Sequence, residues 1–286
     1  SIYLEVRALY SIQGRGLLIF TTMFLIVMGG LGFPVWHDIA INIKKMTEIK
    51  KRPLKWLFTR LCLQSKIVLT MTGLLILCGA VGFFLLEFNN PETMGDMNLL
   101  EKMTASLFQS VTTRTAGFAT VPQGDLRESS KLLGCMLMFI GGSPAGTAGG
   151  VKTTTIAMLL LTVLCVLKNK RDTECFARKI DNNIVRSGIT ITMITLIFLM
   201  SGITALTIFE PGIDFLDLTY EAASAMGTVG LTADLTPILS RGSHVILMIL
   251  MYVGRIGPLT MALALSGRSD KISKFRELPE ENVMLG

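Results

Sequence analysis

Long apolar stretches separated by polar and charged segments dominate the pattern of the 286-residue chain. A helix that crosses a bilayer needs about 20 mostly apolar residues, and five stretches reach this length. The pattern therefore predicts an all-α membrane protein. The five stretches lie at approximately residues 17–43, 66–88, 131–167, 184–209 and 243–265.

The third stretch is too long for one straight span, and its middle is rich in glycine. Residues 141–150 read GGSPAGTAGG. Glycine and proline are the residues that a helix interior tolerates least. We therefore expect two half-helices around an irregular segment. Irregular backbone at membrane depth persists only where protein buries it or water lines it.

A pattern of glycines repeats along the chain. Gly117 lies in a Thr-Ala-Gly-Phe sequence, and Gly230 lies in the similar sequence Thr-Val-Gly-Leu. A glycine-containing helix follows both turns at the same distance, at Gly141 and at Gly254. A third glycine pair begins at Gly29, nearly one repeat interval before Gly141, but no Thr-x-Gly turn precedes it within the chain. We expect that missing turn to lie upstream of Ser1.

Each complete repeat is predicted to contain a helix, a short re-entrant segment, a Thr-x-Gly turn and a second helix. The re-entrant segments, about 101–114 and 216–227, are too short to span a membrane. Gly-interrupted segments at matching positions of a repeat indicate a transport site. The predicted organisation is the last helix of an earlier repeat with a cytoplasmic loop (1–65), a repeat with a broken second helix (66–183), and a further repeat with a cytoplasmic tail (184–286).

Composition and charge agree with a membrane location. The chain is 50% hydrophobic and 17% charged, against about 25% charged residues in a soluble domain. Residues 44–66 hold eight Lys or Arg and one acid, whereas residues 87–130 hold three basic and six acidic residues. The positive-inside rule then predicts a multi-pass plasma membrane protein with its C-terminus in the cytoplasm. This topology accounts for the basic segments, so we expect no nucleic-acid partner.

The apolar stretches lack the groups of catalytic residues that an intramembrane enzyme would need. It has two histidines, and no Ser/His pair, carboxylate pair or histidine cluster lies within the apolar stretches. Its five cysteines form no Cys-x-x-Cys pair and are interpreted as small buried residues. We therefore predict a non-enzyme without a covalent cofactor.

The two Thr-x-Gly turns suit a monovalent cation. Glycine permits positive φ, which allows neighbouring carbonyls to face one axis, and a ring of carbonyls can replace the hydration shell of an ion. A single copy is more simply a tight turn, and the duplication favours the functional interpretation. Glu221, in the second re-entrant segment, is interpreted as packing support and not as a ligand. The candidate residues are Thr115, Ala116, Gly117 and Phe118 in the first turn, and Thr228, Val229, Gly230 and Leu231 in the second turn.

Two basic residues lie close to the glycine-rich segments. Arg255 stands inside the fifth apolar stretch, where an unpaired charge costs several kcal/mol. We expect it to face the irregular segment 141–150 at the inner end of a pore, with snorkelling to the cytoplasmic surface as the alternative. Lys152 follows that segment, and the sequence leaves lining of a cavity and snorkelling equally open.

These motifs in combination resemble the Trk/Ktr/HKT superfamily of potassium transporters, most closely the Ktr-type membrane subunit. The matching segments cover essentially the whole chain. They are residues 113–118 (TRTAGF), the segment Gly141 to Thr155, residues 224–232 (SAMGTVGLT) and residues 254–260 (GRIGPLT). One departure is Thr113, where Ktr-type members often carry proline.

The resemblance implies four membrane–pore–membrane repeats around one pseudo-fourfold pore, of which this chain holds about two and a half. It implies that potassium binds the two turns, which form a selectivity filter, and that Arg255 faces an intramembrane gating loop below them. It also implies a homodimer on a cytosolic ring that binds nucleotide. The residues assigned to the gating loop are Gly141, Gly142, Ser143, Gly146, Thr147, Gly149, Gly150 and Lys152.

Three alternatives remain open at the level of sequence. The first is a sodium-permeable or sodium-coupled (symport) transporter of the same superfamily. The second is a non-conducting membrane scaffold whose glycines only pack helices. The third is a carrier with inverted repeats, although the two complete repeats are predicted to run in the same direction.

Overall fold

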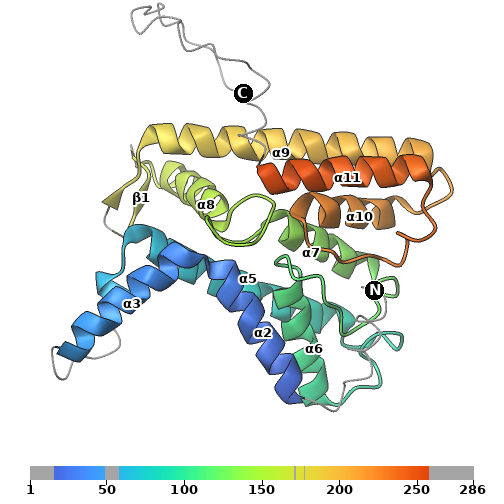
Figure 1. Ribbon diagram of the computed structural model, residues 1–286, viewed down its shortest axis with the longest axis horizontal. Coiled ribbons are helices and arrows are strands. Elements are labelled where there is room, and N and C mark those ends of the chain that lie inside the picture. The colour runs from blue at the N-terminus through green and yellow to red at the C-terminus, as the bar shows by residue number, and fades with distance from the viewer. Residues whose placement is uncertain (1–15, 49–57, 171, 177, 258–286) are drawn as a thin grey trace, which may run out of the picture.

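The computed structural model describes residues 16–48, 58–170, 172–176 and 178–257. These residues are mostly helical, as predicted, with one short hairpin (Figure 1). The helices are α2 (Gly16–Leu31), α3 (Phe33–Glu48), α5 (Leu63–Glu87), α6 (Leu99–Thr112), α7 (Glu128–Phe139), α8 (Thr153–Leu167), α9 (Asn182–Phe209), α10 (Phe215–Gly227) and α11 (Arg241–Ile256). The hairpin pairs β1 (Glu174–Cys175) with β2 (Arg178–Lys179) in antiparallel register.

Helices α9, α10 and α11 pack together along one side of the molecule, and α2, α5 and α6 pack along the other (Figure 1). Helix α7 contacts both α5 and α10 and so joins the two groups. An ion pair of 2.5 Å between Lys131 on α7 and Asp217 on α10 adds to this junction. The short helices α6 and α10 are thus held inside the bundle, each beside the longer helix that precedes it.

Among the described residues, α5 and α9 are long and apolar enough to cross a membrane as single helices. Each begins at a residue whose side chain accepts a backbone N–H: Cys62 accepts from Ser65, and Asp181 accepts from Asn183. Such contacts satisfy amide groups that the first helical turn leaves without partners. The second and fourth predicted stretches correspond to these helices. The end of the fifth stretch, beyond residue 257, lies outside the described residues.

The first apolar stretch is long enough to span a membrane, as predicted, but it is sharply bent. Helices α2 and α3 meet at an angle of 96°. Gly32 between them has φ of +80°, which glycine adopts readily, and Pro34 cannot continue the hydrogen-bond pattern of α2. The indole Nε1 of Trp36 donates to the Met28 carbonyl across the corner at 2.9 Å. The glycines and proline end one helix here and allow the next to start in another direction.

The third stretch is broken, as predicted, into α7 and α8. Ile140 and Val151 at the two ends of the intervening loop form a parallel bridge. Gly141 N–H donates to the Val151 carbonyl at 2.9 Å, and Val151 N–H donates to the Phe139 carbonyl at 3.2 Å. The loop therefore satisfies part of its own backbone, which non-helical chain at membrane depth requires.

A carboxylate at the end of α5 and another just after α9 perform the same structural task. Glu87 Oε1 accepts the backbone N–H of Arg127, the residue that begins α7, at 3.0 Å. Glu210 Oε1 accepts the backbone N–H of Ser240, the residue that begins α11, at 2.7 Å. Each carboxylate fixes the return of the chain into the bundle after one of the Thr-x-Gly turns.

Candidate functional site

The first turn, residues 115–118, follows directly on α6. Both Thr115 and Gly117 have positive φ, of 73° and 76°. Positive φ is rare for a β-branched residue such as threonine and persists only where the surrounding structure enforces it. The Thr112 hydroxyl at the end of α6 donates to the Phe118 carbonyl and closes the turn on its own helix. The turn is therefore a strained segment that a hydrogen bond from the end of α6 holds in place.

The second turn, residues 228–231, follows α10 and repeats this geometry. Thr228 has φ of 52° and Gly230 has φ of 91°. Thr228 N–H donates to the Ala225 carbonyl at 3.0 Å. In both turns a threonine with positive φ precedes a glycine with positive φ by two residues. The two turns therefore share one backbone geometry.

The two turns lie against each other. A Cβ built on Gly117 would stand 2.5 Å from the carbonyl oxygen of Val229 and 3.3 Å from the Cα of Gly230. Only glycine fits at position 117, because any side chain would collide with the backbone of the second turn. The contact continues beyond the turns, where a Cβ on Gly124 would stand 3.3 Å from the Ala233 carbonyl oxygen. The two segments therefore form one structural unit.

Glu221 supports the second turn from α10. Its side chain is buried, with 4% exposed. One carboxylate oxygen accepts the Thr232 hydroxyl and the Ala233 N–H, the latter at 3.0 Å, and the other accepts the Thr236 hydroxyl at 3.1 Å. These contacts agree with the interpretation of Glu221 as support, since both of its oxygens bind the segment that follows the turn.

The segment that the resemblance assigns to a gating loop, residues 141–152, packs against the second turn, and the name gating loop is kept for it below. Gly149 of the loop packs so closely on Thr228 that a Cβ would overlap the threonine hydroxyl, and it would also stand 3.0 Å from the Gly227 carbonyl. The loop is attached to α2 through Ser143, whose N–H donates to the Gly30 carbonyl at 3.0 Å. That carbonyl is available because α2 ends one residue later. Gly141, Gly142, Gly146 and Gly150 also stand where an added Cβ would lie within 3.4 Å of other atoms.

The two basic residues both contact this loop. Arg255, in the last turn of α11, donates from Nη1 to the Thr147 carbonyl. Arg255 therefore does face the loop, and the sequence placed these residues together correctly, although their role in transport is untested. Lys152 Nζ donates to the Ala148 carbonyl at 2.5 Å. Its ammonium group is thus bound to the backbone of the loop itself.

A cavity of about 260 Å³ lies between α2, the first turn and the gating loop. Gly29, Gly30, Thr115 and Thr147 are among the residues that line it. Residues of both the first turn and the gating loop therefore line the same cavity. Oxygen atoms of carbonyls and hydroxyls are the polar groups that the turns offer here, and such neutral oxygens suit a weakly bound monovalent cation.

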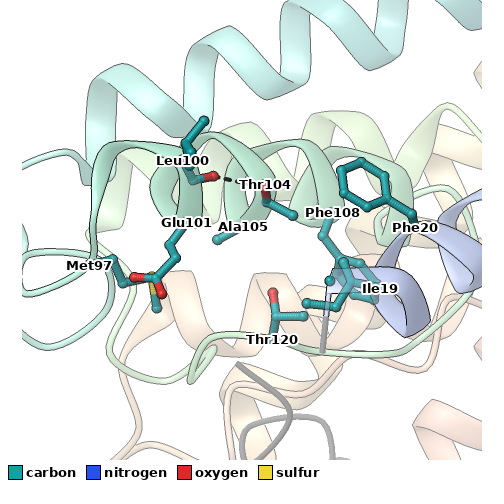
Figure 2. Close-up of a pocket in the computed structure, with 10 residues that line it drawn as sticks. Ile19, Phe20, Met97, Leu100, Glu101, Thr104, Ala105, Phe108 and Thr120 are labelled. Atoms are coloured by element: carbon teal, nitrogen blue, oxygen red, sulfur yellow. Dashed lines mark hydrogen bonds between the residues drawn. The ribbon is translucent and has the colours of Figure 1, made fainter. Parts of the chain in front are cut away.

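Another cavity, of about 150 Å³, lies between α2 and α6 (Figure 2). Its walls are mostly apolar, and two of its three polar side chains, Glu101 and Thr104, have local hydrogen-bond partners. The Glu101 carboxylate accepts the Asn98 N–H at 2.9 Å, and the Thr104 hydroxyl donates to the Leu100 carbonyl at 2.8 Å. None of the residues of the two turns or the gating loop is among those that line it.

The described part of the chain brings no three His, Cys, Asp or Glu residues together in a group that could hold a metal ion. Sequence reasoning did not find the close contact of the two turns at Gly117, nor the attachment of Ser143 to Gly30. Neither has a local signal, because each joins segments that are far apart along the chain.

Comparison with known proteins places the chain in a family. The family model described as "TrkH: Cation transport protein" matches residues 13–275. The chain is 36% identical over 263 residues to the Ktr system potassium uptake protein B of Bacillus subtilis, covering 92% of the chain and 55% of that protein. It is 34% identical to the potassium/sodium uptake protein NtpJ of Enterococcus hirae, covering 98% of the chain and 59% of the relative.

The fold agrees with this assignment. The structure of the potassium transporter TrkH from Vibrio parahaemolyticus matches with a TM-score of 0.64 at 19% identity, over 86% of the chain and 51% of that structure. The chain spans a little over half the length of the curated relatives that it matches. It belongs to the TrkH family of cation transport proteins, which are membrane transporters and not enzymes.

Proposed function

We propose that the protein containing this chain takes up potassium across the plasma membrane, and that residues 115–118 and 228–231 form part of its selectivity filter. The observation that carries the proposal is the pair of turns with matched positive φ at Thr115, Gly117, Thr228 and Gly230. Strained turns of this kind need a reason to persist, and coordination of an ion by aligned carbonyls supplies one.

The helices in front of the turns contribute to the same task. Helices α6 and α10 both end at the turns, so their carbonyl ends lie beside the proposed ion path. The C-terminal end of a helix carries a partial negative charge equivalent to about half an elementary charge. This charge stabilises a cation without a carboxylate, which would bind a monovalent ion too tightly for rapid passage. Two further turns, implied by the resemblance, complete the ring of four.

The gating loop is proposed to obstruct the pore on the cytoplasmic side of the filter. Its contacts with Thr228 through Gly149 and with Arg255 through Thr147 support this assignment. Conduction then requires the loop to leave the second turn. By resemblance, a cytosolic nucleotide-binding ring drives this movement in a homodimer, and the basic segments place the C-terminus on the same, cytoplasmic, side.

The filter proposal is tested with Gly230→Ser in the full-length protein, expressed in bacteria that lack other potassium uptake systems. We expect the ratio of potassium to sodium uptake to fall about ten-fold or more, because a residue with a side chain does not adopt φ of 91° without strain. Gly212→Ser is the matched control, since nothing lies within 4 Å of its Cβ position. An unchanged ratio in Gly230→Ser would refute the filter assignment, and absence of uptake in the wild type itself would favour a non-conducting scaffold.

A second candidate function is sodium-coupled or sodium-permeable transport. The similarity to a relative named as a potassium/sodium uptake protein favours it. Uptake of potassium measured with and without external sodium separates the two. Acceleration by sodium indicates coupling, uptake of sodium itself indicates permeation, and indifference to sodium indicates potassium transport alone.

A further inference from the structure

Three buried polar side chains meet behind the two turns, and the transport proposal above does not use them. Gln109 lies on α6, Gln123 lies shortly after the first turn, and Tyr220 lies on α10. Their exposed fractions are 0%, 3% and 0%. Polar groups are seldom buried this deeply unless hydrogen bonds compensate for the lost water.

The three side chains form one hydrogen-bonded network. Gln109 Nε2 donates to Gln123 Oε1 at 2.5 Å, and Gln123 Nε2 donates back to Gln109 Oε1 at 3.2 Å. The Tyr220 hydroxyl donates to the same Gln123 Oε1 at 2.8 Å. Gln123 Nε2 also donates to the Val121 carbonyl at 2.7 Å. Gln123 therefore connects α6, the segment after the first turn, and α10.

The Tyr220 ring lies in the apolar cluster that backs both turns. The cluster contains Ala119, next to the first turn, and Val229 and Leu231 of the second turn. Gly134 on α7 leaves room for the ring, since a Cβ there would stand 3.1 Å from Tyr220 Cε2. One side chain thus shares an apolar cluster with the second turn and with the residue that follows the first turn, and its hydroxyl binds the segment after the first turn.

The second turn has a corresponding support of its own. Thr236 stands at the same place after Gly230 as Gln123 does after Gly117, so the two residues occupy matching positions of the repeat. The Thr236 hydroxyl donates to Glu221, as Gln123 pairs with Gln109. In both repeats a side chain of the helix before the turn, α6 or α10, therefore binds the segment that follows the turn. Only the first of these supports has the additional contact to Tyr220 in the next repeat.

We infer that Tyr220 and Gln123 are positioning residues that set ion selectivity by fixing the two turns relative to each other. The inference rests on the proposed filter. Discrimination between potassium and sodium depends on the arrangement of the coordinating carbonyls. Turns that hold threonine at positive φ need restraint from outside, and a contact across the repeat boundary restrains both turns together.

Tyr220→Phe in the full-length protein tests the inference with little risk to folding. The ring stays in its cluster, and Gln123 Oε1 keeps the hydrogen bond from Gln109, so this buried acceptor does not lose its last partner. We expect the ratio of potassium to sodium uptake to fall about five-fold, the equivalent of one hydrogen bond of about 1 kcal/mol. The ratio does not depend on the amount of protein, which a purely structural role would change.

Thr219→Val is the matched control. It removes a neighbouring hydroxyl on the same helix, whose hydrogen bond goes to the Phe215 carbonyl of α10 itself. We expect its uptake ratio to equal that of the wild type. An unchanged ratio in Tyr220→Phe, or an equal fall in Thr219→Val, would overturn the inference.

A second variant tests whether the two residues act through their mutual contact. Gln123→Leu should lower the ratio, and adding Tyr220→Phe to it should lower the ratio no further. Losses that multiply would contradict the inference. Gly230→Ser in the same assay separates the two proposals. If it lowers the ratio and Tyr220→Phe does not, the filter stands and the positioning role fails; if it has no effect, the filter assignment itself fails.

Discussion

Arg255 and Thr147 are in hydrogen-bond contact although 108 residues separate them in the sequence. The donor is the guanidinium at the end of α11, and the acceptor is a backbone carbonyl of the gating loop. The contact joins the last described helix to the segment that lies beneath the second turn. Through this contact, α11 directly restrains the position of the loop.

Removal of this contact should favour the open pore. A hydrogen bond from a charged group contributes about 1.5–3 kcal/mol, so Arg255→Gln should shift the balance between closed and open loop by about ten-fold or more. We expect higher potassium uptake in the absence of any stimulus. Arg255→Lys, which keeps the charge, should lie between this variant and the wild type. A basal uptake in Arg255→Gln equal to that of the wild type would contradict the role of the contact.

Gly32 at the corner between α2 and α3 should tolerate no side chain. Its φ is +80°, and a Cβ would stand 2.7 Å from the Pro144 carbonyl oxygen in the gating loop. We expect Gly32→Ala to lower the melting temperature of the purified protein and to disturb the loop, at a cost of about 1–3 kcal/mol. Gly30→Ala is the control, because nothing lies within 4 Å of its Cβ position and alanine favours a helix.

The measurement for this pair is thermal unfolding in detergent, followed by helical circular dichroism. Equal melting temperatures for the two variants would show that the corner does not depend on glycine at position 32. A lower melting temperature in Gly32→Ala alone would show that stability depends on the close backbone contact between the corner and the gating loop.

Glu210 should make the junction of α9 and α11 sensitive to acid. Hydrogen bonds from the Ser240 N–H and the Ser243 hydroxyl lower the pKa of Glu210 below its usual value of 4.5. Because the pKa is lower in the folded state, the stabilisation is present above the unfolded-state pKa and is lost as the pH falls through the folded-state pKa. The wild type should therefore lose stability as the pH falls below the usual value of 4.5.

The comparison is with Glu210→Gln, which keeps an oxygen acceptor but does not titrate. Its thermal stability should be lower than that of the wild type at neutral pH, and the difference should shrink in acid. Other carboxylates titrate equally in both proteins, so the difference isolates Glu210. Parallel curves at all pH values would contradict the assignment.

Much of the helical architecture could be predicted from the sequence because its signals are local. The stretches 66–88 and 184–209 became α5 and α9, and glycine and proline predicted the break between α7 and α8. The re-entrant segments 101–114 and 216–227 lie within two residues of α6 and α10. The stretch 17–43, predicted as a span, is bent at Gly32, and hydrophobicity alone gives no sign of the bend that the glycines and proline there produce.

The candidate site, too, could be predicted only where its signals are local. The glycines that allow positive φ at 117 and 230 were identifiable from the repeat, whereas the packing of Gly117 on Val229 was not. Gln123 and Tyr220 gave no sequence signal, since a lone glutamine and a lone tyrosine 97 residues apart are ordinary core or surface residues. The roles assigned to both turns and to the gating loop stay predictions until transport is measured.

The gating loop is fastened at two places to helices from different parts of the chain, at Ser143 to α2 and at Thr147 to α11. If only the Arg255 contact breaks, the loop remains tied to the Gly30 carbonyl. We therefore expect opening to be a rotation about Ser143 and not a detachment. Such a rotation lets the loop return to the same place beneath Thr228, so that each closure restores the same seal.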